Sequence, residues 1–153
     1  MAETRLLTVA PGSRLLLIRR GTFSASHRLW NPARDEEWNR RTFGPCGRPH
    51  GHGHNYVVEV AIQGVPEEAS GMIMNLTELQ AAIRERILDR VDHRHLNHDV
   101  PFLAEVIPTT ENVALAFWRE LESAFPPGAL YRLRLWETEN NSVELVRSDL
   151  REA

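Results

Sequence analysis

The stretch HGHGHNYVVEVAIQG, residues 50–64, combines the strongest strand signal of the sequence with a cluster of histidines. From His54 to Gln63 it is rich in β-branched residues and is bounded by Gly64, which predicts a strand. Alternate side chains of an extended strand share a face, so His52 and His54 project together. The glycines between the histidines leave the opposite face without side chains and allow close approach of another backbone segment.

Two amphipathic helices are predicted after this strand. The first spans Asn75–Val91, with Asn75 as its N-cap. Its apolar stripe consists of Leu76, Leu79, Ile83, Ile87 and Val91. The second helix runs from Thr110 to Ala124 and ends before the Pro126-Pro127-Gly128 sequence, and Val113, Phe117 and Leu121 lie on one of its faces.

The other regular segments are predicted strands. Leu15–His27 comes before the histidine cluster, and residues 131–137 lead through a turn into Val143–Val146 as a hairpin. The order of two strands, two helices and two strands favours an α+β domain with an antiparallel sheet and both helices on one face. We expect one domain over residues 1–153, with residues 1–13 as an N-terminal extension that need not be ordered. The uncovered sheet face favours oligomerisation.

Composition excludes several classes of function. The net charge of −3 is unlike that of a general nucleic-acid binder. All 18 basic residues are arginine, which excludes lysine Schiff-base chemistry and the Walker phosphate loop. The single Cys46 cannot form an internal disulfide or a multi-thiolate metal site, and this cysteine usage points to the cytoplasm. The sequence has no apolar run of about 18 residues, so no membrane span is expected.

The histidine pattern favours zinc, because zinc binds imidazole nitrogen and a catalytic zinc keeps three protein ligands and one open position. His52 and His54 supply two ligands, and His27 at the end of the neighbouring predicted strand is the preferred third. His50 competes for this role. However, three alternate residues on one strand span about 13 Å, which is too far for one tetrahedral ion. We therefore rank His27 above His50.

Two further groups can carry acid–base chemistry. Asp92-His93 follows the first predicted helix, and a carboxylate beside a histidine can orient an imidazole that shuttles protons, although such pairs also occur by chance. Cys46 lies in a loop rich in glycine and proline next to Arg48, which argues against burial and favours the thiolate.

Glu137 is unusual because it falls on the strand face that Leu133 and Leu135 occupy. It is either a solvated strand end or the anchor of a polar ring. A carboxylate can accept paired hydrogen bonds from an amidine-like N–C–N edge, as it does from arginine.

Together these residues resemble the 6-pyruvoyl-tetrahydropterin synthase family. The match runs through FSASHRL, GPCGRPHGHGHNY, GMIMNLTELQ, LDRVDHRHLN, DVPFLAEVIPTTENVA and PPGALYRLRLWETENNSVEL, nearly all of the chain after residue 20. The resemblance implies the T-fold, a four-stranded antiparallel sheet with two helices on one side. Trimers of this fold form β-barrels that stack as homohexamers, with active sites at subunit interfaces.

The resemblance also implies a role for each candidate residue. The implied roles are zinc ligands for His27, His52 and His54, catalytic base for Cys46, proton relay for Asp92 and His93, pterin anchor for Glu137, and further ring contacts for Thr109, Thr110 and Glu111. The implied substrate is 7,8-dihydroneopterin triphosphate, which is converted to 6-pyruvoyl-tetrahydropterin with loss of triphosphate. Five arginines lie near these residues in the sequence, and each either contacts the triphosphate or belongs to a solvated loop: Arg28, Arg34, Arg40, Arg41 and Arg48.

Two other functions stay open. The same superfamily contains 6-carboxy-tetrahydropterin synthase of the queuosine pathway, which uses the same substrate and also releases acetaldehyde. Its cysteine stands three residues before the HGH pair, a spacing that Cys46 and His50 fulfil, whereas Cys46 and His52 give the five-residue spacing of the pyruvoyl enzyme. A bifunctional enzyme fits both spacings. A non-catalytic pterin-binding or metal-binding homologue is disfavoured, because a binding protein has no use for the base and the relay.

Overall fold

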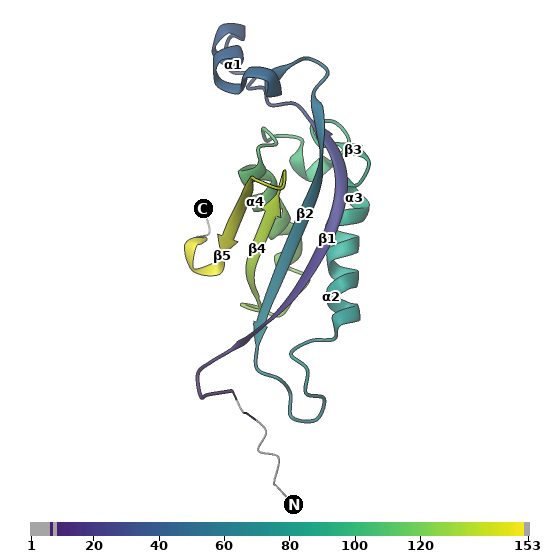
Figure 1. Cartoon of the computed structure of the whole chain (residues 1–153), viewed down its shortest axis with the longest axis vertical. Helices are drawn as coiled ribbons and strands as arrows, with labels where there is room; N and C mark the ends of the chain where they lie inside the picture. The colour runs from purple at the N-terminus through teal and green to yellow at the C-terminus, as the bar shows by residue number, and fades with distance from the viewer. Residues whose placement is uncertain (1–6, 8, 152–153) are drawn as a thin grey trace, which may run out of the picture.

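A computed structural model of the chain describes residues 7 and 9–151. Its centre is a sheet with the strand order β3-β1-β2-β4-β5 (Figure 1). The two long strands β1 (Leu15–His27) and β2 (His52–Gly64) pair antiparallel over their whole lengths. β2 pairs with β4 (Leu130–Trp136), and β4 pairs with β5 (Ser142–Val146), both antiparallel. Residues 1–6 and 8 of the predicted N-terminal extension lie outside the described residues.

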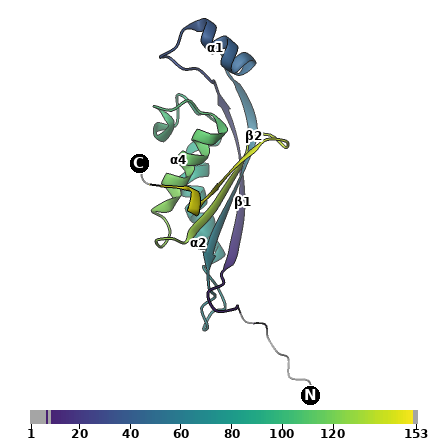
Figure 2. The ribbon, with the colours of Figure 1, turned by 90° about the vertical axis from the view of Figure 1, so that its left-hand side faces the viewer.

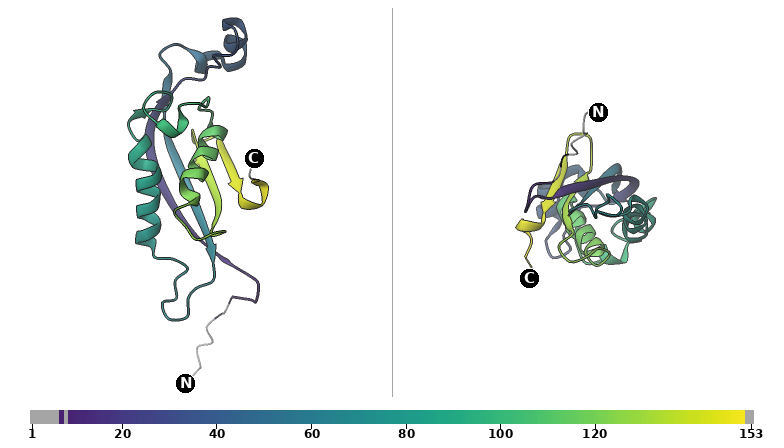
Figure 3. Two further views of the ribbon diagram at one scale, coloured as in Figure 1. Left: turned by 180° about the vertical axis from the view of Figure 1, so that it is seen from behind. Right: turned by 90° about the horizontal axis from the view of Figure 1, so that it is seen from below.

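The long helices cover one face of the sheet, as the sequence predicted (Figure 2). α2 (Leu76–Ile83), a π turn (Arg84–Leu88) and α3 (Asp89–Val91) follow one another as a continuous rod, and α4 (Thr110–Glu122) lies beside it (Figure 3). The α+β class is therefore confirmed. In the described part of the chain, no helix is both long and apolar enough to cross a membrane.

The apolar stripe of the first rod explains its π turn. Leu79, Ile83, Ile87 and Val91 are buried, with exposed fractions of 0–2%. Their spacing of four residues drifts around an α-helix of 3.6 residues per turn. A π turn takes up an additional residue and keeps the stripe on the sheet. The prediction for Leu76 was wrong, because this residue begins the helix and stays half exposed.

Two features of the expected sheet need correction. A fifth strand, β3 (Arg94–His95), pairs parallel to β1 at Ala25 and Ser26, so the sheet has neither four strands nor purely antiparallel pairing. A two-residue strand has no periodicity in the sequence to reveal it. The sheet of one chain is open; the closed barrel that the resemblance implies belongs to a trimer and is not formed by one chain alone.

β1 has a largely unpaired edge. Its inner edge pairs with β2 over 13 residues, whereas on its outer edge β3 meets only Ala25 and Ser26. In the described residues, no strand pairs with the outer edge of residues 15–23.

A short helix was missed in the arginine-rich segment after β1. α1 (Glu36–Phe43) lies beyond the end of the two long strands and is capped by the Asp35 side chain, which accepts the N–H of Trp38 at 2.7 Å (Figure 1). Its first turn is acidic and its last turn is basic, an arrangement that suits the helix dipole. Short 3-10 turns follow at Gly44–Gly47, Pro101–Leu103 and Arg147–Asp149.

Candidate metal centre and active site

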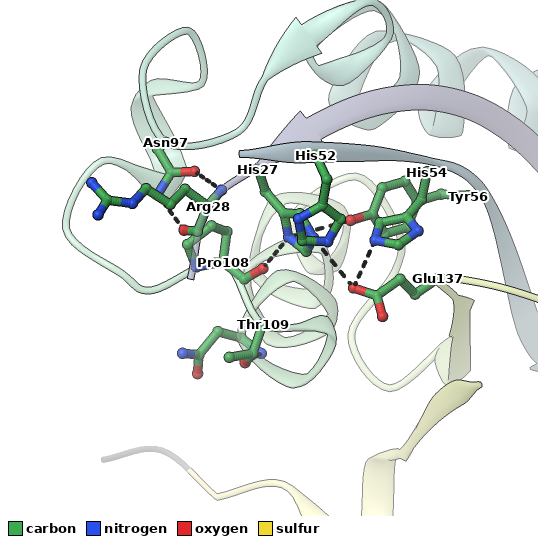
Figure 4. A network of polar contacts seen from close by, with 10 residues as sticks. His27, Arg28, His52, His54, Tyr56, Asn97, Pro108, Thr109 and Glu137 are labelled. Carbon is green, nitrogen blue, oxygen red and sulfur yellow. Dashed lines mark hydrogen bonds and ion pairs between the residues drawn. The ribbon is translucent and has the colours of Figure 1, made fainter. Parts of the chain in front are cut away.

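The register between β1 and β2 places three histidines on one face of the sheet. His27 is the partner of His52, and His54 is the partner of Ala25, two residues earlier on β1. This face also carries the buried Phe23 and Tyr56. The three histidines therefore lie on the face that the helices cover, next to the end of the apolar core. One nitrogen from each ring lies within 4.8 Å of the others, and Figure 4 shows the three rings facing one another.

The orientation of His27 is fixed by a backbone carbonyl. Its Nδ1 lies 2.8 Å from the Pro108 carbonyl oxygen, which accepts a hydrogen bond from Nδ1–H and leaves Nε2 free to bind a metal. Burial lowers the pKa of His27, and burial followed by the neighbouring His54 lowers the pKa of His52. Both imidazoles therefore favour the neutral form that binds metal ions.

The cluster fits a tetrahedral ion. Two nitrogens bound at 2.0–2.1 Å to a tetrahedral zinc lie about 3.3 Å apart, and the Nε2 atoms of His27 and His52 are 3.1 Å apart. Nε2 of His54 is buried without a hydrogen-bond partner in the described residues. A buried polar atom without a partner is costly, and a shared cation satisfies it. His50, the competing ligand, is exposed in the turn before β2 and is not in this group.

Gly51 allows the close approach that brings His52 beside His27. Its φ is +67°, and a Cβ built on it would lie 2.4 Å from the carbonyl oxygen of His27. Any larger residue at position 51 would clash with the backbone of His27, which explains the glycine between His50 and His52.

We expect Gly51→Ala to destabilise the fold by more than about 2 kcal/mol, because a left-handed conformation alone costs an alanine about 1–2 kcal/mol and the clash adds to this. Gly71→Ala is the matched control, since Gly71 has a φ of +69° and open space around its Cβ position. Urea unfolding of the two variants separates strain from clash. Equal losses in both variants would contradict the steric role of Gly51.

Glu137 directly follows β4 and points at the histidines (Figure 4). Its Oε1 lies 3.6 Å from Nε2 of His27 and 3.8 Å from Nε2 of His54. The side chain is 20% exposed. It is therefore directed to the core side, as its position in the alternation with Leu133 and Leu135 predicted.

Asp92 and His93 are held at the outer edge of β1. Oδ1 of Asp92 accepts the N–H of Ser24 at 2.8 Å, and the N–H of His93 is bonded to the Ser24 carbonyl at 2.7 Å. The other oxygen of Asp92 lies 3.0 Å from Nδ1 of His93, whose φ is +57° and whose side chain is largely exposed. The carboxylate can therefore orient this imidazole as expected.

The space that His93 faces lies on the reverse side of the two long strands. His93 lines a cavity of 570 Å³ together with Ser24, Ser26 and Asn55, and His54 of the histidine cluster also borders this cavity. In the register of β1 and β2, these three strand residues alternate with the positions of the histidine cluster. The structure thus does not bring Asp92 and His93 together with the three histidines on one face.

We expect Asp92 to make stability depend on acid pH. The hydrogen bond from the Ser24 N–H, followed by weaker contacts with His93, lowers the pKa of Asp92. A lowered pKa in the folded state stabilises the protein above the ordinary value, and this contribution is lost as the pH falls through the folded value. The effect stays below about 1 kcal/mol, because water screens an exposed carboxylate.

Urea unfolding of wild type and Asp92→Asn checks this expectation. The difference in unfolding free energy should be largest near neutral pH and disappear toward pH 2–3, below the usual pKa of an aspartate. A difference that does not change with pH would contradict it.

Cys46 is tied to the segment that follows His27. It lies half buried in the 3-10 turn Gly44–Gly47, and its carbonyl accepts the N–H of Leu29 at 2.9 Å. Nε of Arg28 donates to the Gly47 carbonyl at 3.0 Å. These two hydrogen bonds hold the turn close to the end of β1. Such a position is required if Cys46 is to act beside the histidines.

The five candidate arginines separate into two groups. Arg28, Arg40 and Arg48 line a cavity of 230 Å³ beside α1. Arg34 instead stacks over the ring of Trp38, and Arg41 is exposed on α1.

The predicted ring contacts lie at the start of α4. Oγ1 of Thr109 caps this helix by accepting the N–H of Asn112 at 3.3 Å, and Thr110 and Glu111 form its first turn. Because the preceding residue, Pro108, holds His27, this segment begins beside the histidine cluster (Figure 4).

Sequence reasoning missed two supporting residues. Asn97 bonds both backbone groups of Arg28, receiving its N–H at 2.8 Å and donating to its carbonyl at 2.9 Å. Pro108 acts through a carbonyl, which every residue has, so its side chain gives no signal. The sequence offered one signal for a supporting role of Asn97, namely its position in the polar segment that follows Asp92.

Comparisons with known proteins agree with this geometry. The family model for 6-pyruvoyl tetrahydropterin synthase matches residues 17–148. The 6-pyruvoyl tetrahydrobiopterin synthase of Homo sapiens is 46% identical over 125 residues, which cover 82% of this chain and 86% of that protein. A putative 6-carboxy-5,6,7,8-tetrahydropterin synthase of Archaeoglobus fulgidus is 35% identical over 102 residues, 67% of this chain and 79% of the relative. The structure of Caenorhabditis elegans 6-pyruvoyl tetrahydropterin synthase superposes with a TM-score of 0.84 at 34% identity, covering 92% of this chain and 99% of that one.

Proposed function

Because this chain belongs to the 6-pyruvoyl tetrahydropterin synthase family, we propose that it is a zinc-dependent lyase acting on 7,8-dihydroneopterin triphosphate. The products are 6-pyruvoyl-tetrahydropterin and triphosphate. The convergence of three imidazoles and the Glu137 carboxylate at one end of the core carries this proposal. The presence of a single cysteine in the chain supports a cytoplasmic location.

The residues of the chain divide the chemistry between them. His27, His52 and His54 hold the zinc, which when bound polarises the side-chain oxygens of the pterin and makes the adjacent C–H protons removable. Cys46, as a thiolate, takes such a proton. His93, oriented by Asp92, returns a proton.

Ring binding falls to a separate set of residues. Glu137 accepts paired hydrogen bonds from the N–C–N edge of the pterin, and the segment of Thr109, Thr110 and Glu111 contacts the ring from the start of α4. The cavity lined by Arg28, Arg40 and Arg48 is the place for the triphosphate, since guanidinium groups bind phosphate oxygens in a fixed fork.

A homohexamer with shared active sites is part of the proposal. Two observations support it: His93 lines a cavity together with strand residues that alternate with the positions of the histidine cluster, and in the described residues β1 has a largely unpaired edge. A relay on the reverse face serves the metal centre of a neighbouring subunit when open sheets join into a barrel.

The second candidate is 6-carboxy-tetrahydropterin synthase activity, alone or in addition. The three-residue interval between Cys46 and His50 favours it. The five-residue interval to His52 favours the pyruvoyl product, and the position of His50 outside the histidine cluster supports this choice.

Anaerobic incubation of the zinc-loaded protein with 7,8-dihydroneopterin triphosphate tests the proposal. Mass spectrometry should find 6-pyruvoyl-tetrahydropterin, and an acetaldehyde assay should stay negative. Acetaldehyde together with a 6-carboxy product would favour the second candidate. Pterin binding without turnover would instead assign the chain to a non-catalytic homologue.

A further inference from the structure

The side chain of Asn97 extends the pairing along the outer edge of β1 by one position beyond β3. Along one edge a strand offers its backbone groups at every second residue. The N–H of Leu96, directly after β3, donates to the Ser26 carbonyl at 2.8 Å. The next position on this edge is Arg28, and there the pairing groups belong to the Asn97 side chain (Figure 4).

The carboxamide of Asn97 satisfies both backbone groups of Arg28. Its Oδ1 accepts the Arg28 N–H at 2.8 Å, and its Nδ2 donates to the Arg28 carbonyl at 2.9 Å. A neighbouring strand would supply the same two groups from its backbone. The backbone does not supply them here, because the chain turns at residues 95–99, where the His95 carbonyl accepts the Asp99 N–H at 2.9 Å.

Arg28 lies between the metal centre and the turn that carries Cys46. It directly follows the candidate ligand His27. Its Nε donates to the Gly47 carbonyl at 3.0 Å, and the N–H of the next residue, Leu29, donates to the Cys46 carbonyl at 2.9 Å. A shift of the Arg28 backbone therefore moves the Cys46 turn.

His27 has supports of its own. Its Nδ1 is bonded to the Pro108 carbonyl, and its backbone lies opposite His52 in the register of β1 and β2. Loss of the Asn97 side chain leaves both supports in place, whereas the segment that holds the Cys46 turn loses its anchor. Metal binding and the reaction of the cysteine should therefore respond differently.

We propose that Asn97 is a positioning residue, which holds the backbone after His27 so that the Cys46 thiolate reaches the proton that it removes. This inference rests on the proposed function, in which Cys46 is the base. Asn97 acts through Arg28 and Leu29 on the turn of the base. A displaced base costs rate rather than substrate binding, and misplacement by about 1 Å lowers a rate by about 100-fold.

Three variants test the proposal. Asn97→Ala removes both hydrogen bonds, and Asn97→Asp keeps an oxygen that accepts the Arg28 N–H. The matched control is Asn39→Ala, because Asn39 bonds both backbone groups of Asn31 in the same way, at 2.7 and 2.9 Å, but lies in α1. Urea unfolding measures the stability that each variant loses.

Single-turnover kinetics of the zinc-loaded proteins with 7,8-dihydroneopterin triphosphate give the main readout. We expect Asn97→Ala to lower the rate at saturating substrate by about 10–100-fold, to change KM by less than about 3-fold and to keep its zinc. Asn97→Asp should recover most of the rate. Asn39→Ala should keep the wild-type rate at saturating substrate although it loses stability.

Alkylation gives a second readout that needs no turnover. Cys46 is the only cysteine of the chain, so the rate of its reaction with iodoacetamide reports on this turn alone. We expect Asn97→Ala to react at least about 3-fold faster than wild type or Asn39→Ala, because a segment without its anchor opens more often.

Equal single-turnover rates of Asn97→Ala and wild type would overturn the inference. An equal loss of rate in Asn39→Ala would also overturn it, because general destabilisation would then be the cause. Loss of zinc from Asn97→Ala would show that Asn97 supports His27 instead of Cys46. A wild type that forms the pyruvoyl product beside an equally fast Asn97→Ala keeps the proposed function and removes only the role of Asn97, whereas a wild type without turnover removes both.

Discussion

Replacement of His52 by alanine will leave the protein without bound zinc and without turnover. The zinc content should fall from about one ion per chain to near zero, and activity to below about 1% of wild type, because loss of a direct ligand costs at least the 10–100-fold that loss of a supporting contact costs. The two remaining imidazoles, His27 and His54, cannot complete a three-ligand site. Elemental analysis and the product assay measure the two losses.

His50→Ala is the matched control for this experiment. His50 lies two residues upstream, is exposed and is outside the histidine cluster, so its replacement should leave about one zinc per chain. Wild-type zinc content and activity in His52→Ala would contradict the assignment. If zinc were lost in His50→Ala instead, the shorter spacing from Cys46 would define the site.

Cys46→Ala should lower kcat by about 10²–10⁴-fold, the usual contribution of a general base, and leave zinc bound. Cys46 lies in a separate turn from the three histidines, so the metal centre does not depend on its side chain. Single-turnover kinetics and zinc content, measured on the same sample, check both parts of this expectation.

Cys46→Ser separates ionisation from packing. Serine keeps nearly the same volume, but its hydroxyl does not ionise near neutral pH. It should therefore be as slow as the alanine variant. Wild-type kcat in Cys46→Ala would place the base elsewhere, and recovery of the rate in Cys46→Ser would point to a packing role.

The elements with a clear period could be predicted from the sequence, and the others could not. β2 and the rod of α2 and α3 lie close to their predicted ranges, because alternation and a stripe of four-residue spacing reflect burial against one core. β3 is two residues long and depends on the path that the chain takes after His93, so only tertiary contacts define it. α1 had readable signals in the Asp35 cap and the acidic first turn, but it packs away from the main core and has no long stripe.

The candidate site shows the same division. Strand alternation pairs His52 with His54, and the position of His27 at the end of a neighbouring strand made it the preferred third histidine. The contact of Glu137 with this cluster needed the register between β2 and β4, which depends on a bulge at Ala61 and Ile62. Backbone partners such as the Pro108 carbonyl have no side-chain signature, and the opposite orientation of Asp92 and His93 needs the three-dimensional path of the chain.

If the outer edge of β1 pairs with another copy of the chain, as in the proposed hexamer, stability will depend on the protein concentration. Residues 15–23 present backbone donors and acceptors that no strand of the described chain takes up, and such an edge is a template for another strand. Association that satisfies this edge stabilises the folded state by mass action. In that case a melting temperature measured at one protein concentration would not apply at another, and loss of assembly on dilution would appear as loss of thermal stability.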